Sequence, residues 1–373
     1  MKRTITICAA IAALVLGGCG GHSGLNNGAM PQLSPQGSVI EPQIGFMTPA
    51  PAHFSRFAAP ETPSGSISIG TDGAVYMDAT QSFLRFNGSF TRIPYNTDPS
   101  RNVNSDGDIN ALITGPRAGA DGTIWTLFRH LEGEPFTTAG RYDVTTRAVT
   151  ESPAITTLGD ENVVSLASGG DGNVWVTGFG YTGSRDDGFI TIVTPSLGFA
   201  SHGPTIPSDD PVDAITLAPD GGVYVATVPA LNPGVTLSRI IRFDSHSYAT
   251  TTICNLPAGS SVAAMTGASD GNVWFTDSGL NKIGRLGTKC ALTYFKVPTA
   301  SAGLSGITSA PDNALWFSEY NSNKIGRITT GGAITEYRIP SPGTHPKAIT
   351  AAHGRLPVLL YFVENGALGG LTF

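Results

Sequence analysis

The sequence is poor in charge and in helical patterning. Charged residues make up only 13% of the 373 positions, and the net charge is −6 at pH 7. Lysine and arginine form no cluster or basic stripe, which excludes nucleic acid as an expected partner. After the first twenty positions, no apolar pattern with the i, i+3, i+4 spacing of a helix persists. Because the chain also contains 47 glycines, these absences indicate an all-β protein with many turns.

The first segment has the pattern of an export signal. Lys2 and Arg3 precede an apolar run from Ile5 to Leu16, and these 12 residues are too few to span a bilayer. The sequence Leu16-Gly17-Gly18-Cys19 that follows resembles the lipobox of bacterial lipoproteins, in which the cysteine becomes the acylated N-terminus. The alternative is an ordinary secretory leader with an incidental cysteine. We expect an exported protein that is anchored to the bacterial cell envelope through lipidated Cys19.

Three segments follow from this pattern. Residues 1–18 are expected to form the signal peptide, and residues 53–373 the folded domain. Residues 19–52 are rich in Gly, Ser, Pro and Asn, with little apolar surface to bury, so they are expected to form a flexible tether.

A repeat organises the rest of the chain. Residues 269–285 (SDGNVWFTDSGLNKIGR) and residues 311–327 (PDNALWFSEYNSNKIGR) lie 42 positions apart and share eight of seventeen residues. The underlying signature, a turn pair followed by a strand with Trp or Tyr, occurs seven times. It lies at Asp72-Gly73 with Tyr76, Asp121-Gly122 with Trp125, Asp171-Gly172 with Trp175, Asp220-Gly221 with Tyr224, Asp270-Gly271 with Trp274, Asp312-Asn313 with Trp316, and His353-Gly354 with Tyr361. A period of about 40 to 50 residues is typical of four-stranded propeller blades. The sequence therefore predicts a seven-bladed β-propeller, which favours a monomer.

The last copy predicts how the ring closes. After His353-Gly354 only two strands remain, at residues 358–363 and 367–373, so this blade lacks its outer strand. Residues 53–60 (HFSRFAAP) have the outer-strand pattern, and we expect them to fill the gap. The four tryptophans, at equivalent positions, are expected to pack between blades. Gly284 and Gly326 are expected to allow close approach of the next blade.

Two cysteines remain once Cys8 and Cys19 are assigned to the leader and the anchor. An exported protein permits a disulfide between Cys254 and Cys290. However, aligning Pro257 with Pro298 places the two cysteines at opposite ends of neighbouring outer strands. That separation exceeds the ~7 Å limit for bridged Cα atoms. The pairing stays open, with the geometry against it, and the spacing does not support a zinc site.

The blade motif resembles a known family. An Asp-Gly turn, then WF[TS][DE], then NKIGR and a Pro-bounded strand are similar to the virginiamycin B lyase family, most strongly over residues 262–342. The resemblance implies a lyase that opens a cyclic depsipeptide at an ester bond by elimination, with a His base and a magnesium ion held by Glu side chains. The family's Glu-x-His-Gly-Ile stretch corresponds to residues 303–307, so Gly303 stands at the Glu position and Ser305 at the His position. Only Glu319, after the aromatic strand, is retained as a candidate magnesium ligand.

Two rings of residues are predicted at one end of the central channel. The first contains the residues at the start of the innermost strands, which are Gly65, Asn110, Val164, Asp213, Ala263, Ser305 and Lys347. The second follows the aromatic strands and contains Ala79, Phe128, Gly178, Thr227, Asp277, Glu319 and Glu364. Asp277, Glu319, Glu364 and Lys347 are expected to cluster over blades 5 to 7, with His345 within reach. The cluster is interpreted as solvated rim charge, a small-ligand or cation site, or a catalytic site.

Two functions of different class remain at this point. The first is a membrane-anchored binding module that holds a small molecule, peptide or glycan at the propeller rim, with candidate ligands at Glu319, Asp277, Glu364, Lys347, Ser305, Asp213 and Asn110. The second is a magnesium-dependent carbon-oxygen lyase, or a hydrolase, with a rearranged site. A Ser without a partner is not a base for proton abstraction, which favours the binding module.

Overall fold

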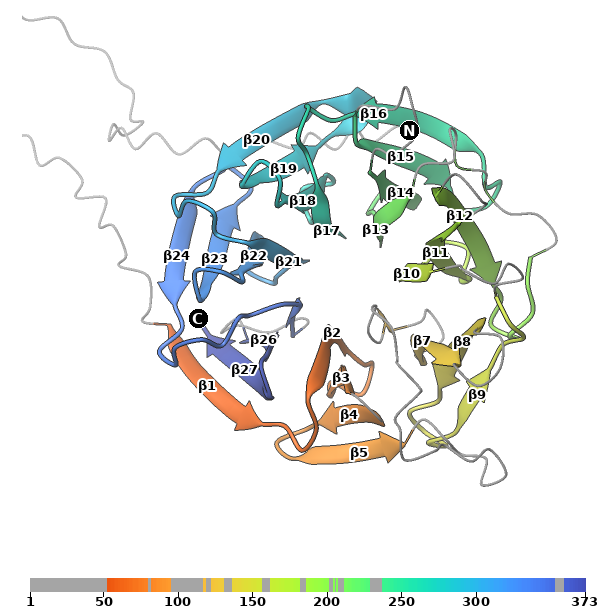
Figure 1. The fold of residues 1–373 in the computed structure, drawn as a ribbon, viewed down its shortest axis with the longest axis horizontal. Helices are drawn as coiled ribbons and strands as arrows, with labels where there is room; N and C mark the ends of the chain where they lie inside the picture. Colours follow the sequence, from red (N-terminus) through yellow and green to blue (C-terminus); the bar gives the residue numbers. More distant parts are fainter. Residues whose placement is uncertain are drawn as a thin grey trace, which may run out of the picture. The chain divides into compact units, whose positions relative to one another are not determined.

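Seven antiparallel sheets surround a central axis in the computed structural model (Figure 1). The structure describes residues 52–79, 82–94, 117–118, 122–130, 136–155, 162–181, 186–200, 204, 206, 211–228, 237–352 and 359–373. In each blade the strands follow one another outward from the axis. The predicted seven-bladed β-propeller is therefore confirmed.

The first four blades follow chain order. Blade 1 contains β2 (Pro63–Ile69), β3 (Val75–Ala79), β4 (Ser82–Phe86) and β5 (Phe90–Pro94). Blade 2 contains β6 (Arg117–Ala118), β7 (Ile124–His130), β8 (Phe136–Tyr142) and β9 (Val149–Glu151). The described residues of blade 3 form β10 (Asn162–Ser168), β11 (Val174–Tyr181), β12 (Asp186–Val193) and an isolated bridge between Val193 and Phe199. Blade 4 contains β13 (Val212–Leu217), β14 (Gly222–Thr227), β15 (Arg239–Asp244) and β16 (Thr250–Asn255).

The last three blades complete the ring. Blade 5 contains β17 (Val262–Gly267), β18 (Val273–Asp277), β19 (Lys282–Leu286) and β20 (Leu292–Lys296), with the short helix η1 (Thr288–Cys290) before β20. Blade 6 contains β21 (Leu304–Ser309), β22 (Ala314–Glu319), β23 (Lys324–Thr329) and β24 (Ile334–Arg338). Blade 7 contains β25 (Ile349–Ala351), β26 (Leu359–Glu364), β27 (Ala367–Thr372) and, as its outer strand, β1 (His53–Ala58).

The N-terminal strand closes the ring as the sequence predicts. β1 pairs antiparallel with β27, from His53 opposite Thr372 to Ala58 opposite Ala367. An ion pair of 2.8 Å between Arg56 Nε and Glu364 Oε2 ties this strand to β26. The last blade therefore takes its outer strand from the start of the domain, and the two ends of the folded unit are joined by strand pairing.

The hydrophobic core lies between blades. The described residues form seven clusters of buried apolar side chains, and each cluster joins two neighbouring blades. Trp274 packs with Leu315 and Phe317 of blade 6, and Trp316 packs with Phe362 of blade 7. Both indoles are fully buried, and so are those of Trp125 and Trp175. The predicted inter-blade role of the tryptophans is confirmed.

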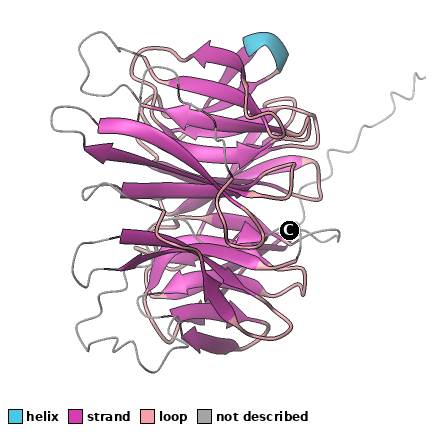
Figure 2. Cartoon of the chain, turned by 90° about the vertical axis from the view of Figure 1, so that its right-hand side faces the viewer, coloured by secondary structure: helices cyan, strands magenta, loops and turns pink. Residues whose placement is uncertain are grey.

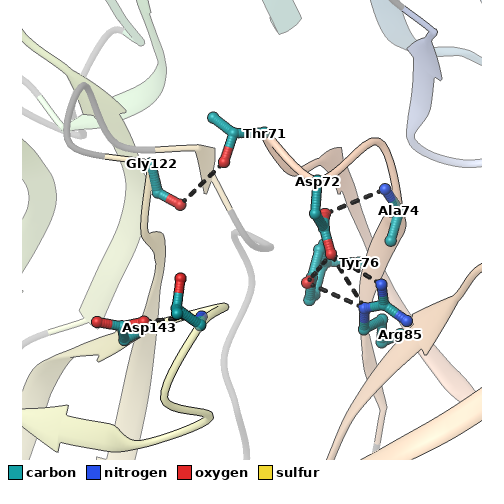
Figure 3. A network of polar contacts seen from close by, with 8 residues as sticks. Thr71, Asp72, Ala74, Tyr76, Arg85, Gly122 and Asp143 are labelled. Carbon is teal, nitrogen blue, oxygen red and sulfur yellow. Dashed lines mark hydrogen bonds and ion pairs between the residues drawn. The ribbon is translucent and has the colours of Figure 1, made fainter.

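The turn pair anchors the following aromatic strand, as blades 1 and 6 show. The glycine takes a positive φ, 74° at Gly73, which glycine adopts without a steric penalty. In blade 1 the Asp72 carboxylate accepts a hydrogen bond of 2.9 Å from the Tyr76 hydroxyl and pairs at 2.9 Å with Arg85 (Figure 3). Asp312 and Arg327 pair in the same way, at 2.8 Å. The aspartate and arginine of the family-like motif therefore stabilise the blade, at the end of the ring opposite the start of the innermost strands.

The asparagine of the NKIGR element also has a structural task. Asn281 and Asn323 adopt positive φ values of 53° and 57°, and each side chain binds the loop that leads to the next blade. Asn281 Nδ2 donates a hydrogen bond of 2.8 Å to the Thr299 carbonyl oxygen. Its Oδ1 accepts a hydrogen bond of 2.9 Å from the Ala302 amide. The asparagine of this motif thus fixes the connection between neighbouring blades.

The interpretation of the strand glycines was wrong in one respect. A Cβ atom at Gly284 would lie 2.1 Å from the Phe275 ring, and one at Gly326 would lie 2.1 Å from the Phe317 ring. These phenylalanines are the cross-strand partners of the glycines within the same blade. The missing side chain therefore makes room for an aromatic ring of the same sheet, and not for the backbone of the next blade.

The expectation that Cys254 and Cys290 lie too far apart was also wrong. They form a disulfide, with 5.4 Å between their Cα atoms. Figure 1 shows the outer strands following one another head to tail around the rim, so the end of β16 meets the segment before β20. The sequence alignment treated the two strands as parallel neighbours. Strand twist turns the outer strand of each blade along the circumference instead.

The predicted leader, tether and acylated cysteine lie outside the described residues. A view from the side of the ring shows the strands and the short helix η1 (Figure 2). Within the described residues, no helix is long and apolar enough to cross a membrane.

Candidate functional site

A β-bulge lies near the start of the innermost strand in five blades. In β13 the pairing passes from Val212–Thr227 to Ala214–Ala226, and Asp213 is left out of the register. Ala263 in β17 and Val164 in β10 occupy the same extra position. In β21 the shift spans Ser305 and Gly306, and in β2 it begins after Pro63. Because a bulge re-aims the inserted side chain, Asp213, Ala263 and Ser305 face the axis.

The bulge positions open into an axial channel of about 570 Å³. Gly65, Asp213, Ala263 and Ser305 of the first predicted ring line it, and Ala263 is exposed. Asn110, the blade 2 member, lies outside the described residues. A channel of this volume is within the range of small-molecule pockets.

The channel wall is rich in hydroxyl groups that the sequence reasoning did not identify. They come three residues after a ring position in five blades, as Ser68, Thr216, Thr266, Thr308 and Thr350. In blades 1, 4, 5 and 6 the spacing is three because the bulge shifts the strict alternation of the strand. A periodic Ser or Thr after each ring position was the signal that could have identified them.

Asp213 is the single titratable residue of the channel lining, within the part of the chain that the structure describes. Its carboxylate has no hydrogen-bond or ion-pair partner among those residues. Burial raises the pKa of this carboxyl to about 6. The Asp213 carboxylate can therefore bind a hydrogen-bond donor or a cationic group of a ligand.

Lys347 lies at the start of blade 7, beside the same channel. Its Cδ would lie 3.3 Å from a Cβ at Gly65, so the aliphatic stem runs next to a channel-lining position of blade 1. Its Nζ makes no ion pair or hydrogen bond with the described residues. Blades 4 and 7 are three steps apart in a ring of seven, and Figure 1 places β13 and β26 on opposite sides of the centre. Asp213, which lines the channel, and Lys347, which lies beside a channel-lining residue, therefore come from opposite sides of the ring and carry opposite charges.

His345 is near this end but is engaged with a neighbouring loop. Its ring lies 4.8 Å from that of Tyr320, between centroids, and its Nδ1 is 3.1 Å from the Tyr320 carbonyl oxygen. Its φ of 47° is uncommon for a residue other than glycine. The contact fixes the imidazole against blade 6.

The carboxylates of the second predicted ring are buried, so their interpretation as solvated rim charge was wrong. Asp277 is 0% exposed and accepts hydrogen bonds from the amides of Ser261 and Leu280, at 3.1 and 3.0 Å. Its other oxygen accepts 3.0 Å from the Tyr294 hydroxyl. Glu364 is 2% exposed and pairs with Arg56. Burial raises the pKa of Glu364, although Arg56 opposes the shift. Both residues stabilise their own blades.

Glu319 is buried in blade 6 with one oxygen satisfied. Ser322 donates a hydrogen bond of 2.6 Å to Oε2, whereas Oε1 is buried without a partner among the described residues. Burial, with a smaller contribution from Glu336, raises the pKa of Glu319 to about 7. The Glu336 carboxylate is itself bound by Lys324 at 2.6 Å and by Thr299 at 2.7 Å.

These carboxylates do not fit the magnesium site that the family resemblance implies. They lie in different blades, and each is engaged with its own protein partners. In the described ranges, no three His, Cys, Asp or Glu side chains are grouped closely enough to hold a metal ion. Magnesium prefers several oxygen ligands in near-octahedral geometry, which Glu319 with its Ser322 contact does not provide.

The stretch that corresponds to the family's catalytic motif differs in backbone as well as in side chains. Gly303 has a φ of 67°, and a Cβ there would lie 2.6 Å from the Asn321 side chain. A glutamate is therefore strained at this position. At Ser305 the carbonyl oxygen accepts 2.6 Å from the Thr276 hydroxyl, which fixes the backbone of this residue to blade 5.

Comparison with known proteins supports the resemblance. Residues 205–368 match the family model described as the Virginiamycin B lyase family. A solved virginiamycin B lyase from Staphylococcus aureus superposes with a TM-score of 0.68 at 23% identity, covering 87% of this chain and 100% of that one. A solved streptogramin B lyase gives 0.67 at 22% identity, covering 86% and 97%. At this identity the superpositions establish the shared fold. No curated protein sequence matches the chain.

A third solved structure is of a variant of the same Staphylococcus aureus enzyme. It is a catalytically inactive variant of the Staphylococcus aureus lyase, with a histidine replaced by alanine, together with quinupristin. It superposes at a TM-score of 0.68 with 23% identity, and covers 87% of this chain and 100% of that one.

Proposed function

We propose that the chain is an envelope-anchored binding protein that holds a small polar ligand at the mouth of its axial channel. The observation that carries this proposal is the chemistry of the channel lining, which combines small residues and hydroxyls with the unpartnered carboxylate of Asp213. Such a wall offers hydrogen bonds and volume for a ligand. The location in the cell envelope rests on the sequence pattern that ends at Cys19.

The family's ring-opening elimination is not part of this proposal. Ser305 stands where the resemblance places the histidine base, and a positioned general base typically contributes about 10² to 10⁴ in rate. Gly303 stands at the glutamate position in a backbone conformation that disfavours a side chain. Glu319, the retained carboxylate, is enclosed by Ser322 and the blade 6 network.

Ligand binding can be tested with a channel blocked by one substitution. Ala263 is exposed in the channel wall, so Ala263→Trp places an indole in the lumen without displacing core atoms. Thermal shift and calorimetry would use triglycine, N-acetyl-triglycine, triglycinamide, glucose and N-acetylglucosamine as probes. We expect at least one probe to bind the wild type and to lose binding in Ala263→Trp. Lys296→Trp, at an exposed position on the outer strand of the same blade, is the matched control. Binding of no probe, or equal binding by both variants, would overturn the proposal.

A lyase with a rearranged site is the second candidate, and Asp213 is the residue that favours it. A carboxylate with a pKa of about 6 is better matched to proton abstraction near neutral pH than an ordinary aspartate. In that case the wild type would open quinupristin at its ester bond, as detected by mass spectrometry, and Asp213→Asn would abolish the opening. We expect no opening with or without added magnesium.

A further inference from the structure

Two groups of opposite charge, neither with a partner among the described residues, belong to blades on opposite sides of the ring. Asp213 enters the channel from the bulge of β13, and Lys347 lies beside Gly65 at the start of blade 7. The other charged residues of the predicted rings are buried: Asp277 and Glu364 are bound by protein partners, and Glu319 has one oxygen on Ser322 and the other enclosed without a partner among the described residues. Among the described residues of the two rings, the partly exposed charges are thus one acid, Asp213, and one base, Lys347.

From this arrangement we infer that the ligand is a small zwitterion, such as a short peptide or an amino acid, with its amine on Asp213 and its carboxylate on Lys347. The inference rests on the proposed function and adds the ligand class. Burying a carboxylate without a partner is unfavourable, and an ammonium group offsets this cost with charge-assisted hydrogen bonds. Lys347 provides a matching donor for the opposite end of the same molecule.

The rest of the wall fits the middle of such a ligand. Ser68, Thr216, Thr266, Thr308 and Thr350 form a ring of hydroxyls in the wall. The hydroxyls of Thr216, Thr266 and Thr308 donate to the carbonyl oxygen of the next residue, and their lone pairs can accept hydrogen bonds from the amide N–H groups of a peptide. Small wall residues such as Ala263 and Gly306 leave space for the backbone of a peptide and little apolar surface for large side chains.

Three forms of one peptide separate the two charge contacts. Triglycine has both charges, N-acetyl-triglycine has only the carboxylate, and triglycinamide has only the amine. In calorimetry, the wild type should bind triglycine most tightly. Each of the two singly charged forms should bind with an affinity lower by about tenfold or more. Equal affinities for the three forms would overturn the inference.

Substitutions assign each charge to its residue. In Asp213→Asn, triglycine and N-acetyl-triglycine should bind equally, because the amine no longer has its counter-ion. In Lys347→Met, triglycine and triglycinamide should bind equally, for the corresponding reason at the carboxylate. When a substitution in the protein and a change in the ligand have non-additive effects on affinity, the two changed groups interact. A preference for the free amine that survives in Asp213→Asn would contradict the assignment.

The controls separate this inference from the proposed function. Asp244→Asn removes a carboxylate from a turn of the same blade at the opposite end of the ring, and should leave binding unchanged. Binding of glucose or N-acetylglucosamine that is blocked by Ala263→Trp but unaffected by Asp213→Asn would preserve the binding function and overturn the zwitterion. Failure of all probes would overturn both. Unchanged melting temperatures would show that each variant is folded.

Discussion

Thr276 Oγ1 donates a hydrogen bond of 2.6 Å to the carbonyl oxygen of Ser305, and so links the aromatic strand of blade 5 to the mouth of the channel in blade 6. One blade further on, the Ser318 hydroxyl donates in the same way to the Lys347 carbonyl oxygen and accepts 2.9 Å from the Gly306 amide. The Ser or Thr of the WF[TS][DE] motif is thus an inter-blade contact. It holds the backbone of two candidate ligand-binding positions.

Replacing this hydroxyl should therefore destabilise the protein. Thr276→Val keeps the shape of the side chain and leaves the Ser305 carbonyl without its donor, and we expect a loss of about 1 to 2 kcal/mol. Thr276→Ser restores the donor and should recover most of the stability. Denaturant unfolding monitored by tryptophan fluorescence measures both. A valine variant as stable as the wild type would contradict this role.

Ring closure by β1 can be tested by two deletions. Removing residues 52–60 exposes the edge of β27 and leaves the buried Glu364 without Arg56. We expect the melting temperature to fall by about 10 °C or more, because several kcal/mol are lost. Removing residues 20–47, the expected tether, should change it little. Equal melting temperatures for the two deletions would exclude closure by the N-terminal strand.

Asp78 should make stability depend on pH. It is 1% exposed in β3, with a contact of 3.5 Å to the Thr126 hydroxyl, and burial raises its pKa to about 7. An unfolded aspartate has a pKa of ~3.9, so between these values the folded state binds more protons than the unfolded state. The free energy of unfolding should therefore fall as pH rises from about 4 to 7.

The matching variant is Asp78→Asn, which keeps the size of the side chain and cannot ionise. It should flatten the pH profile and raise stability at pH 8 by about 1 to 3 kcal/mol. Asp213 and Glu319 contribute slopes of the same sign, so the profile should flatten only in part. If Asp78→Asn shows the same dependence of the unfolding free energy on pH as the wild type, Asp78 does not cause that dependence.

The envelope anchor has a direct assay. The full chain, expressed in a bacterium that processes lipoproteins, should partition into the detergent phase of a Triton X-114 extraction. Cys19→Ser should move it to the aqueous phase, because stable anchoring requires the acyl chains. Cys8→Ser, in the expected leader, is the control and should leave partitioning unchanged. A Cys19→Ser protein that stays in the detergent phase would contradict the lipid anchor.

The local pattern of the sequence was sufficient to predict the architecture. Each copy of the turn pair and aromatic strand specifies one blade through local contacts, and in blade 6 the NKIGR element adds the pair of Asp312 with Arg327. The count of copies then fixes the number of blades, and the incomplete last copy predicts closure by β1. Trp274 and Trp316 were identified as inter-blade core because a strand buried on both faces has a continuous apolar run.

The burial and pairing of the site residues depend on contacts between residues that are not neighbours in the sequence. Asp277, Glu319 and Glu364 occupy equivalent positions, yet whether each faces water or protein is decided by Tyr294, Ser322 and Arg56, which come from other strands and loops. The bulges at Asp213 and Ser305 re-aim side chains by one residue, and the inclination of the outer strands brings Cys254 to Cys290. Periodicity determined which residues share a ring. Only the tertiary structure decided which charges of that ring are left for a ligand, because burial and pairing arise from contacts between blades.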